Sequence, residues 1–172
     1  MNAFSDWLLT FNVDDFVNAH DWVWPVCEIL HFFGMALLIG TVGLVDLRIL
    51  GGVKGLPIRA LEKLVPFGIA GFVINVVTGI IFVSGNVDGD PIYYLVNTAF
   101  QVKMILILIG GINVLLFYVL GIAREADAVG PSGSASGKAK VVAGTSLVIW
   151  FGVILFGRLI MYNDTLLYFL GL

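Results

Sequence analysis

The sequence predicts an all-α membrane protein: a four-helix transmembrane bundle preceded by a short N-terminal interfacial helix. Of the 172 residues, 59% are hydrophobic and 12% are charged, and the mean hydropathy is +1.02, whereas soluble domains carry about 25% charged residues. Charged side chains are absent from four stretches, residues 29–45, 64–87, 104–123 and 141–157. Each reaches or nearly reaches the roughly 17–25 residues that cross a bilayer. We therefore expect one domain, residues 1–172, that lies in a lipid bilayer.

The expected elements follow in order along the chain. Residues 3–18 mix aromatic and acidic side chains, which is typical of a short helix lying on the membrane surface. The first span is expected at about 22–50, with Pro25 in the first turn, where its missing N–H breaks no helical hydrogen bond. The second span follows Pro66 and is expected at about 66–84. The third and fourth spans are expected at about 100–123 and 140–162.

Basic residues in the connections between spans predict the orientation of the chain. They occur in the first and third connections, as Lys54, Arg59, Lys63, Arg124, Lys138 and Lys140. The second connection, residues 84–100, contains no Lys or Arg. Because basic loops mark the cytoplasmic side of a membrane protein, the first and third connections are expected in the cytoplasm. Both termini are then expected on the periplasmic or exterior side.

Composition also excludes several classes of function. A net charge of −3 provides no basic patch for nucleic acid, and a single cysteine cannot form an internal disulfide. The chain contains no P-loop, nucleophile elbow or zincin helix, so we assign no catalytic residue. A bundle this small is expected to form a homo-oligomer, which could create sites between subunits.

Four ionisable residues are expected at a similar depth in the outer half of the membrane. A rise of about 1.5 Å per residue places Glu28 and His31 roughly 9 and 13 Å beyond Trp22, and it brings Lys103 and Arg158 to the same layer from two other spans. Intramembrane charges usually face the bundle interior or a water-filled cavity. One interpretation is a structural ion cluster in which Glu28 pairs with one of the cations. The other is an anion site, which the propionates of a haem, a small anionic substrate or a lipid headgroup would fit.

Other polar residues lie within the spans. Asn75, Thr78 and Asn113 are expected to form hydrogen bonds between helices, as polar side chains in membrane bundles usually do. Asp46 and Arg48 are expected to form a separate pair near the inner surface.

A stripe of metal-ligand side chains follows one face of the first span. Cys27, His31 and Met35 are spaced at i, i+4 and i+8, and His20 extends this stripe if the helix continues backward. Thiolate, thioether and imidazole together favour soft or borderline metals such as copper. The alternative is that Cys27 and Met35 are ordinary apolar filler, since steps of about 6 Å make a site shared by all three side chains difficult.

Haem b is the other cofactor that the sequence favours. Histidine is a common haem axial ligand, and an ionisable residue within a span is by default a functional candidate, so His31 is the expected ligand. His20 is either a second ligand or a residue at the membrane interface. The many glycines of the spans would let a flat macrocycle approach the backbone, or they simply let helices pack closely. His31 could instead be buried neutral beside Glu28.

Several phrases of the sequence carry a resemblance to a known family. These phrases are W-x-x-P-x-x-E-x-x-H-x-x-G (Trp22 to Gly34), DLRILG, FQVKM and GRLI. Together they resemble an uncharacterised family of small bacterial four-helix inner-membrane proteins. The resemblance implies the four-helix fold and a location in the bacterial inner membrane. The layout is also loosely similar to membrane b-type cytochrome bundles and to copper-resistance membrane proteins.

Three hypotheses of function follow. The first is a haem b-binding, redox-active protein that transfers electrons or performs redox chemistry at the periplasmic face, with His31 as axial ligand, Lys103 and Arg158 holding propionates, and an unknown redox partner. The second is a copper-handling or small-solute transport protein that uses Cys27, His31 and Met35. The third is a structural membrane subunit without a cofactor.

Overall fold

The computed structural model describes residues 6–8, 10–53, 55–85, 91–122, 124 and 133–171, and their secondary structure is helical, without strands. The long helices are α3 (Val23–Leu50), α5 (Val65–Ser84), α7 (Thr98–Val119) and α9 (Gly137–Leu159). The short ones are α2 (Val13–Asn18), α4 (Ile58–Glu62), α6 (Ile92–Leu95), η1 (Ile160–Tyr162) and α10 (Asn163–Leu170). Four helical segments are long and apolar enough to cross a membrane, which confirms the predicted all-α bundle. The protein is a multi-pass membrane protein.

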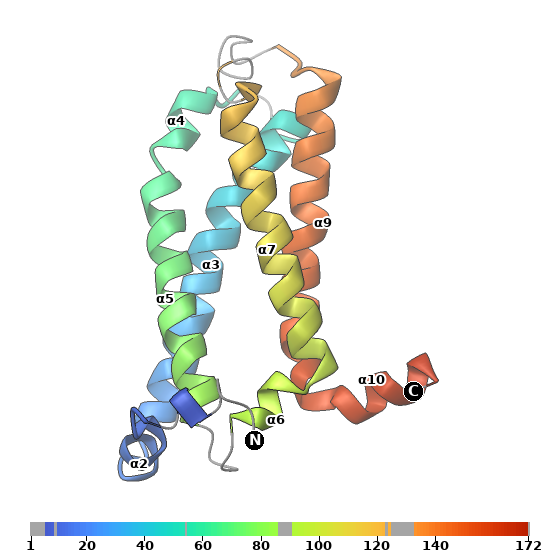
Figure 1. Ribbon diagram of the computed structural model, residues 1–172. Coiled ribbons are helices and arrows are strands. Elements are labelled where there is room, and N and C mark those ends of the chain that lie inside the picture. Colours follow the sequence, from blue (N-terminus) through green and yellow to red (C-terminus); the bar gives the residue numbers. More distant parts are fainter. Residues whose placement is uncertain are drawn as a thin grey trace.

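The four long helices form two pairs. Helix α3 packs along α5, α7 packs along α9, and α3 and α9 join the two pairs, whereas α5 and α7 make few direct contacts. Figure 1 shows α2 and α10 at one end of the bundle and α4 at the other. The long helices begin and end within about one turn of the predicted spans, so the charge-free stretches located them well.

Helix boundaries follow from local side-chain chemistry. Pro25 occupies the first turn of α3, and Gly51, with a φ of 90°, ends this helix in the left-handed conformation that glycine adopts without strain. Asn97 caps α7 by accepting a hydrogen bond from the Phe100 backbone N–H at 3.0 Å. The same side chain donates to the Ile160 carbonyl oxygen at 3.0 Å, so this cap also ties α7 to the end of α9.

Close approach of α3 and α5 depends on two glycines. A Cβ atom on Gly34 would lie 2.8 Å from the backbone oxygen of Gly71, and one on Gly71 would lie 2.5 Å from the backbone oxygen of Gly34. In the other pair, a Cβ on Gly152 would lie 2.9 Å from the side chain of Leu106. Small residues therefore serve helix packing at these positions, as in many membrane bundles.

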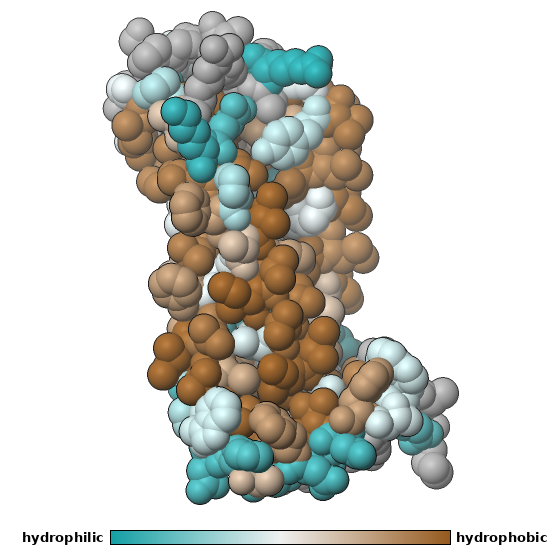
Figure 2. Space-filling view, turned by 90° about the vertical axis from the view of Figure 1, so that its left-hand side faces the viewer, coloured by the Kyte–Doolittle hydropathy of each residue, from teal (hydrophilic) through white to brown (hydrophobic). Residues whose placement is uncertain are grey.

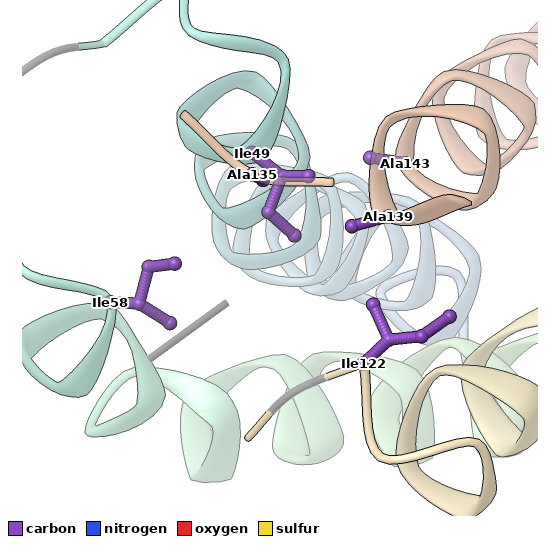
Figure 3. Packing of buried hydrophobic residues seen from close by; sticks show 6 residues of the cluster. All are labelled: Ile49, Ile58, Ile122, Ala135, Ala139 and Ala143. Atoms are coloured by element: carbon purple, nitrogen blue, oxygen red, sulfur yellow. The ribbon is translucent and has the colours of Figure 1, made fainter. Parts of the chain in front are cut away.

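The outer surface and the α4 end complete the fold. Figure 2 shows a broad hydrophobic band over the middle of the molecule, with hydrophilic residues gathered at its two ends. This pattern matches a bundle whose sides face lipid. At the α4 end, a buried apolar cluster closes the bundle (Figure 3). Its members are Ile49, Ile58, Ile122, Ala135, Ala139 and Ala143.

Candidate functional site

Two cavities lie between the α3–α5 pair and the α7–α9 pair. The first, which we call the His31 cavity, has a volume of about 410 Å³ and is lined by His31 and Lys103 among mostly apolar side chains. The second, the Asp46 cavity, has a volume of about 340 Å³ and is lined by Asp46 among mostly apolar side chains. They share a wall, formed by Leu38, Phe72, Ile107 and Trp150.

Both cavities reach the side of the bundle. Ile80 on α5 and Met104 on α7 line the His31 cavity, and both are exposed. Ile69 on α5 and Tyr118 on α7 line the Asp46 cavity, and they are exposed as well. Because α5 and α7 make few direct contacts, both cavities open between these two helices, toward the lipid.

His31 is held by a hydrogen bond from one helix to another. Its Nδ1 lies 2.7 Å from Oγ1 of Thr78 on α5, and the Thr78 hydroxyl donates to the Ile74 carbonyl oxygen, also at 2.7 Å. The Thr78 hydroxyl has one proton: directed to Ile74, it leaves Nδ1 of His31 as the donor and Nε2 with the lone pair, and directed to His31, it makes Nδ1 the acceptor. In both cases Nδ1 is anchored, and Nε2 has no hydrogen-bond partner in the described part of the chain. One anchored ring nitrogen is also what a metal-ligating histidine has.

Lys103 supplies a cation to the same cavity. It lies on α7, close enough to His31 to interact with it electrostatically. Its side chain runs along Gly157 of α9, where an added Cβ would lie 3.5 Å from Nζ. The absence of a side chain at Gly157 leaves room for the end of the lysine side chain, and Lys103 also lines the cavity. The two groups that the structure brings together are thus an imidazole and an ammonium.

Three other predicted site residues lie outside both cavities. Glu28 is exposed and accepts a hydrogen bond from Trp24 Nε1 at 3.2 Å, one turn earlier on α3. Arg158 is exposed, and its guanidinium carbon lies 5.6 Å from the centre of the Tyr162 ring. His20 is exposed before α3, where its Nδ1 lies 3.0 Å from a backbone oxygen. A shared depth therefore does not bring these side chains to a shared face.

The sulfur-containing residues of the predicted stripe separate in the same way. Cys27 is buried in a cluster with Val17 of α2 and Val23, away from both cavities. Met35 lines the His31 cavity, and Met104 of α7 contributes a second thioether to it. Among the described residues, no group of three or more His, Cys, Asp or Glu side chains is close enough to hold a metal.

Two residues that line the Asp46 cavity each have a buried polar atom without a partner in the described chain. Asp46 is 6% exposed and interacts with the Ser146 hydroxyl of α9, but within the described chain its Oδ2 accepts no hydrogen bond. Trp150, 7% exposed, leaves its Nε1–H unpaired as well. Arg48, the predicted partner of Asp46, is buried and donates from Nε to the Leu56 carbonyl oxygen at 2.7 Å.

Sequence reasoning missed two features of these sites. The partner of His31 is Thr78, not the neighbouring Glu28 that we considered, although the expectation that Thr78 bonds between helices is confirmed. The role of Trp150 was also missed, because a tryptophan in a span is normally an apolar residue or an interfacial anchor. Its spacing of four residues from Ser146 was the available signal, since it places both on one face of α9.

Comparisons with known proteins identify no relative of this chain. The chain matches no protein family model, no curated protein and no solved structure. The family resemblance carried by the sequence phrases therefore stays a prediction, and the functional argument depends on the residues of the two cavities.

Proposed function

We propose that this protein is a haem b-binding, redox-active membrane protein, with His31 as an axial ligand. The observation that supports the proposal is the His31–Thr78 hydrogen bond, which anchors Nδ1 of a histidine that lines a cavity. Axial histidines in haem proteins need both features, because the anchored nitrogen sets the tautomer and the other nitrogen binds iron. The bound group would supply one-electron chemistry, and the protein would supply the ligand, the apolar surroundings and the charge.

Lys103 has the charge that a haem propionate requires. In a buried, apolar cavity a carboxylate is costly unless a cation pairs with it. Lys103 lines the cavity beside His31, whereas Arg158, the other cation predicted for this role, is exposed. The proposal therefore assigns the propionate contact to Lys103.

The apolar lining of the cavity suits an apolar group. Ligand cavities are commonly about 300–1,000 Å³ and mainly apolar, and the His31 cavity is about 410 Å³. Gly79 lines this cavity, and a Cβ added there would meet no atom within 4 Å. Met104 on α7 provides a thioether as a candidate second ligand, since methionine pairs with histidine in some cytochromes.

We infer the membrane and the orientation from the sequence. The bacterial inner membrane follows from the family resemblance, and the basic first and third connections would face the cytoplasm. Both termini, α2 and α10 would then lie on the periplasmic side, and the His31 cavity would lie in the periplasmic half of the bundle. Electron exchange with an unknown redox partner would occur at this face, with homo-oligomers as the expected assembly.

Copper is the second candidate, because His31 and Met35 line one cavity. An imidazole and a thioether suit copper, and Met104 could add a second sulfur. Cys27 would take no part in this site, because it lies in a separate apolar cluster. A copper protein would carry metal but would lack the strong Soret absorption of haem.

One experiment separates haem, copper and a cofactor-free subunit. The full-length protein is purified in detergent, and its reduced-minus-oxidised absorption spectrum is recorded together with iron and copper analysis. A Soret band with iron, lost in His31→Ala and kept in His20→Ala, is the expected result. Copper without a Soret band would favour the second candidate. A folded protein with neither metal after expression with supplied haem and copper would contradict both.

A further inference from the structure

We propose that α10 lies flat in the membrane interface, with one apolar face against lipid and the opposite, polar face in water. Helix α10 (Asn163–Leu170) leaves the bundle sideways at the α2 end (Figure 1). Three large side chains near its C-terminal end are exposed: Tyr168 is 82% exposed, Phe169 81% and Leu170 58%. Such a cluster marks a contact surface for a partner, and the position of α10 identifies this partner as the bilayer.

Hydrogen bonds fix the place where α10 begins. The Asn163 side chain accepts hydrogen bonds from the backbone N–H groups of Thr98 and Ala99, at 3.0 and 3.4 Å. Both groups belong to the first turn of α7, where backbone N–H groups have no partner within their own helix. Asn97 also donates to the carbonyl oxygen of Ile160, shortly before α10. The chain therefore turns away from α9 at a point that is tied to α7, and α10 starts from a fixed position.

One face of α10 is mainly apolar and begins against the bundle. Side chains three and four positions apart share a helix face, and those on this face are Asn163, Leu166, Leu167 and Leu170. The first three are partly buried, and α10 contacts α7, so this face is directed toward the bundle. Phe169, three positions after Leu166, lies at the edge of the same face. Beyond α7 the face continues with Phe169 and Leu170, which are both exposed.

The opposite face of α10 is polar. Asp164, Thr165 and Tyr168 lie on it, and all three are exposed. An aspartate requires water unless it is paired, and tyrosine is enriched where a membrane meets water. Because α10 contains no Lys or Arg, anionic lipid headgroups have no basic side chain to attract. Burial of the apolar face therefore supplies the attachment.

The bilayer is the partner because α10 lies at the edge of the hydrophobic band. Figure 2 shows this band over the middle of the molecule and hydrophilic residues at the two ends, and the long helices run through the band as candidate spans. A helix that runs sideways at the α2 end lies in the plane of the membrane, and its bundle-facing side is directed toward the acyl chains. Amphipathic helices in this position bury their apolar face about 5–10 Å into the boundary between headgroups and chains.

Spin labels on the two faces of α10 test this placement. The full-length protein carries Cys27→Ala, which removes the only native thiol, together with either Leu170→Cys or Asp164→Cys, and it is reconstituted in phosphatidylcholine vesicles. Val148→Cys, at a position of α9 that is 73% exposed on the side of the bundle, is the matched lipid-facing control. The collision rates of each nitroxide with oxygen, which concentrates in lipid, and with a water-soluble nickel chelate are measured by electron paramagnetic resonance.

We expect the ratio of oxygen to nickel collisions at Leu170→Cys to approach that at Val148→Cys and to exceed that at Asp164→Cys several-fold. Added phosphatidylglycerol should leave the three ratios unchanged. Equal, low ratios at Leu170→Cys and Asp164→Cys would overturn the proposal, because α10 would then lie in water. A Leu170→Cys label shielded from both reagents would overturn it as well, and spin–spin broadening would then identify a second copy of the chain as the cover. Neither result depends on the presence of haem.

Discussion

The His31 cavity and the Asp46 cavity are neighbours in one bundle, but they offer opposite chemistry. In the His31 cavity the ring is already anchored by Thr78, and what remains available is the second ring nitrogen and a lysine cation. In the Asp46 cavity an acidic side chain and an indole each retain an unpaired buried atom. The first arrangement suits a metal-centred or anionic group, whereas the second keeps an acceptor and a donor buried behind the cavity wall.

Depth in the membrane does not define a site by itself. The two cavities share Leu38, Phe72, Ile107 and Trp150. However, a lysine lines one and an aspartate lines the other, and their polar side chains differ in whether they have hydrogen-bond partners. Each cavity should therefore respond to substitutions on its own lining, while both should respond to changes in the packing of α3 against α5.

Filling one cavity with a phenylalanine side chain should remove the ligand of that cavity completely. Gly79 lines the His31 cavity and Gly111 lines the Asp46 cavity, and an added Cβ at either position meets no atom within 4 Å. Gly79→Phe should abolish the haem spectrum, whereas Gly111→Phe should leave it intact. The thermal stability should not fall in either variant, since replacing a helical glycine improves helix propensity. If Gly111→Phe lost the haem spectrum while remaining folded, the two cavities would act as one site.

A substitution at the α3–α5 contact should lower the stability of the bundle that forms both cavities. The Cβ of Gly71→Ala would lie 2.5 Å from the backbone oxygen of Gly34, and backbone cannot yield as a flexible side chain can. We expect a loss of about 3 kcal/mol in the free energy of unfolding, at the upper end for overpacking, measured by denaturant titration in detergent. Gly40→Ala is the matched control on α3, because its Cβ would meet nothing within 4 Å. Equal stability of the two variants would contradict the close α3–α5 contact.

Removing the Thr78 hydroxyl tests the anchoring of His31 alone. Thr78→Val keeps the shape of the side chain but leaves the His31 Nδ1–H without its acceptor. Losing the hydrogen-bond partner of a ligating histidine typically lowers affinity 10–100-fold, which haem titration followed by absorbance would measure. Thr78→Ser should retain most of the affinity, and Thr145→Val, at an exposed position of α9, should change nothing. Unaltered haem affinity in Thr78→Val would show that the His31–Thr78 bond does not support a ligand.

The fold could be predicted from sequence because the bilayer imposes a simple rule. Charge-free runs of the right length mark spans, and Pro25 and Pro66 mark helix starts, so the long helices were located to about one turn. The depth of His31 and Lys103 followed from helical rise alone. These properties depend on one helix at a time.

The lateral direction of each side chain could not be predicted in the same way. Glu28 and Arg158 share the expected depth of His31, but rotation of α3 and α9 about their axes places both on the exposed side. That rotation is set by contacts such as Gly34 against Gly71, which join residues 37 positions apart and leave no signal in a single sequence. The His31–Thr78 pair depends on the same packing, which is why a local partner, Glu28, was considered first.

Removing the charge of Glu28 or of Arg158 tests whether these side chains point away from the ligand. Glu28 and Arg158 lie near the depth of His31 but outside both cavities, so Glu28→Gln and Arg158→Gln should each change haem affinity less than about threefold, as exposed substitutions usually do. Lys103→Gln, the same kind of charge removal on the cavity side, should weaken binding about tenfold, because a hydrogen bond to a charged group is lost. Titration of the three purified variants under one set of conditions gives the ranking. An Arg158→Gln protein as weak as Lys103→Gln would mean that Arg158 turns inward when the group is bound, and the division between cavity-facing and outward-facing charges would fail.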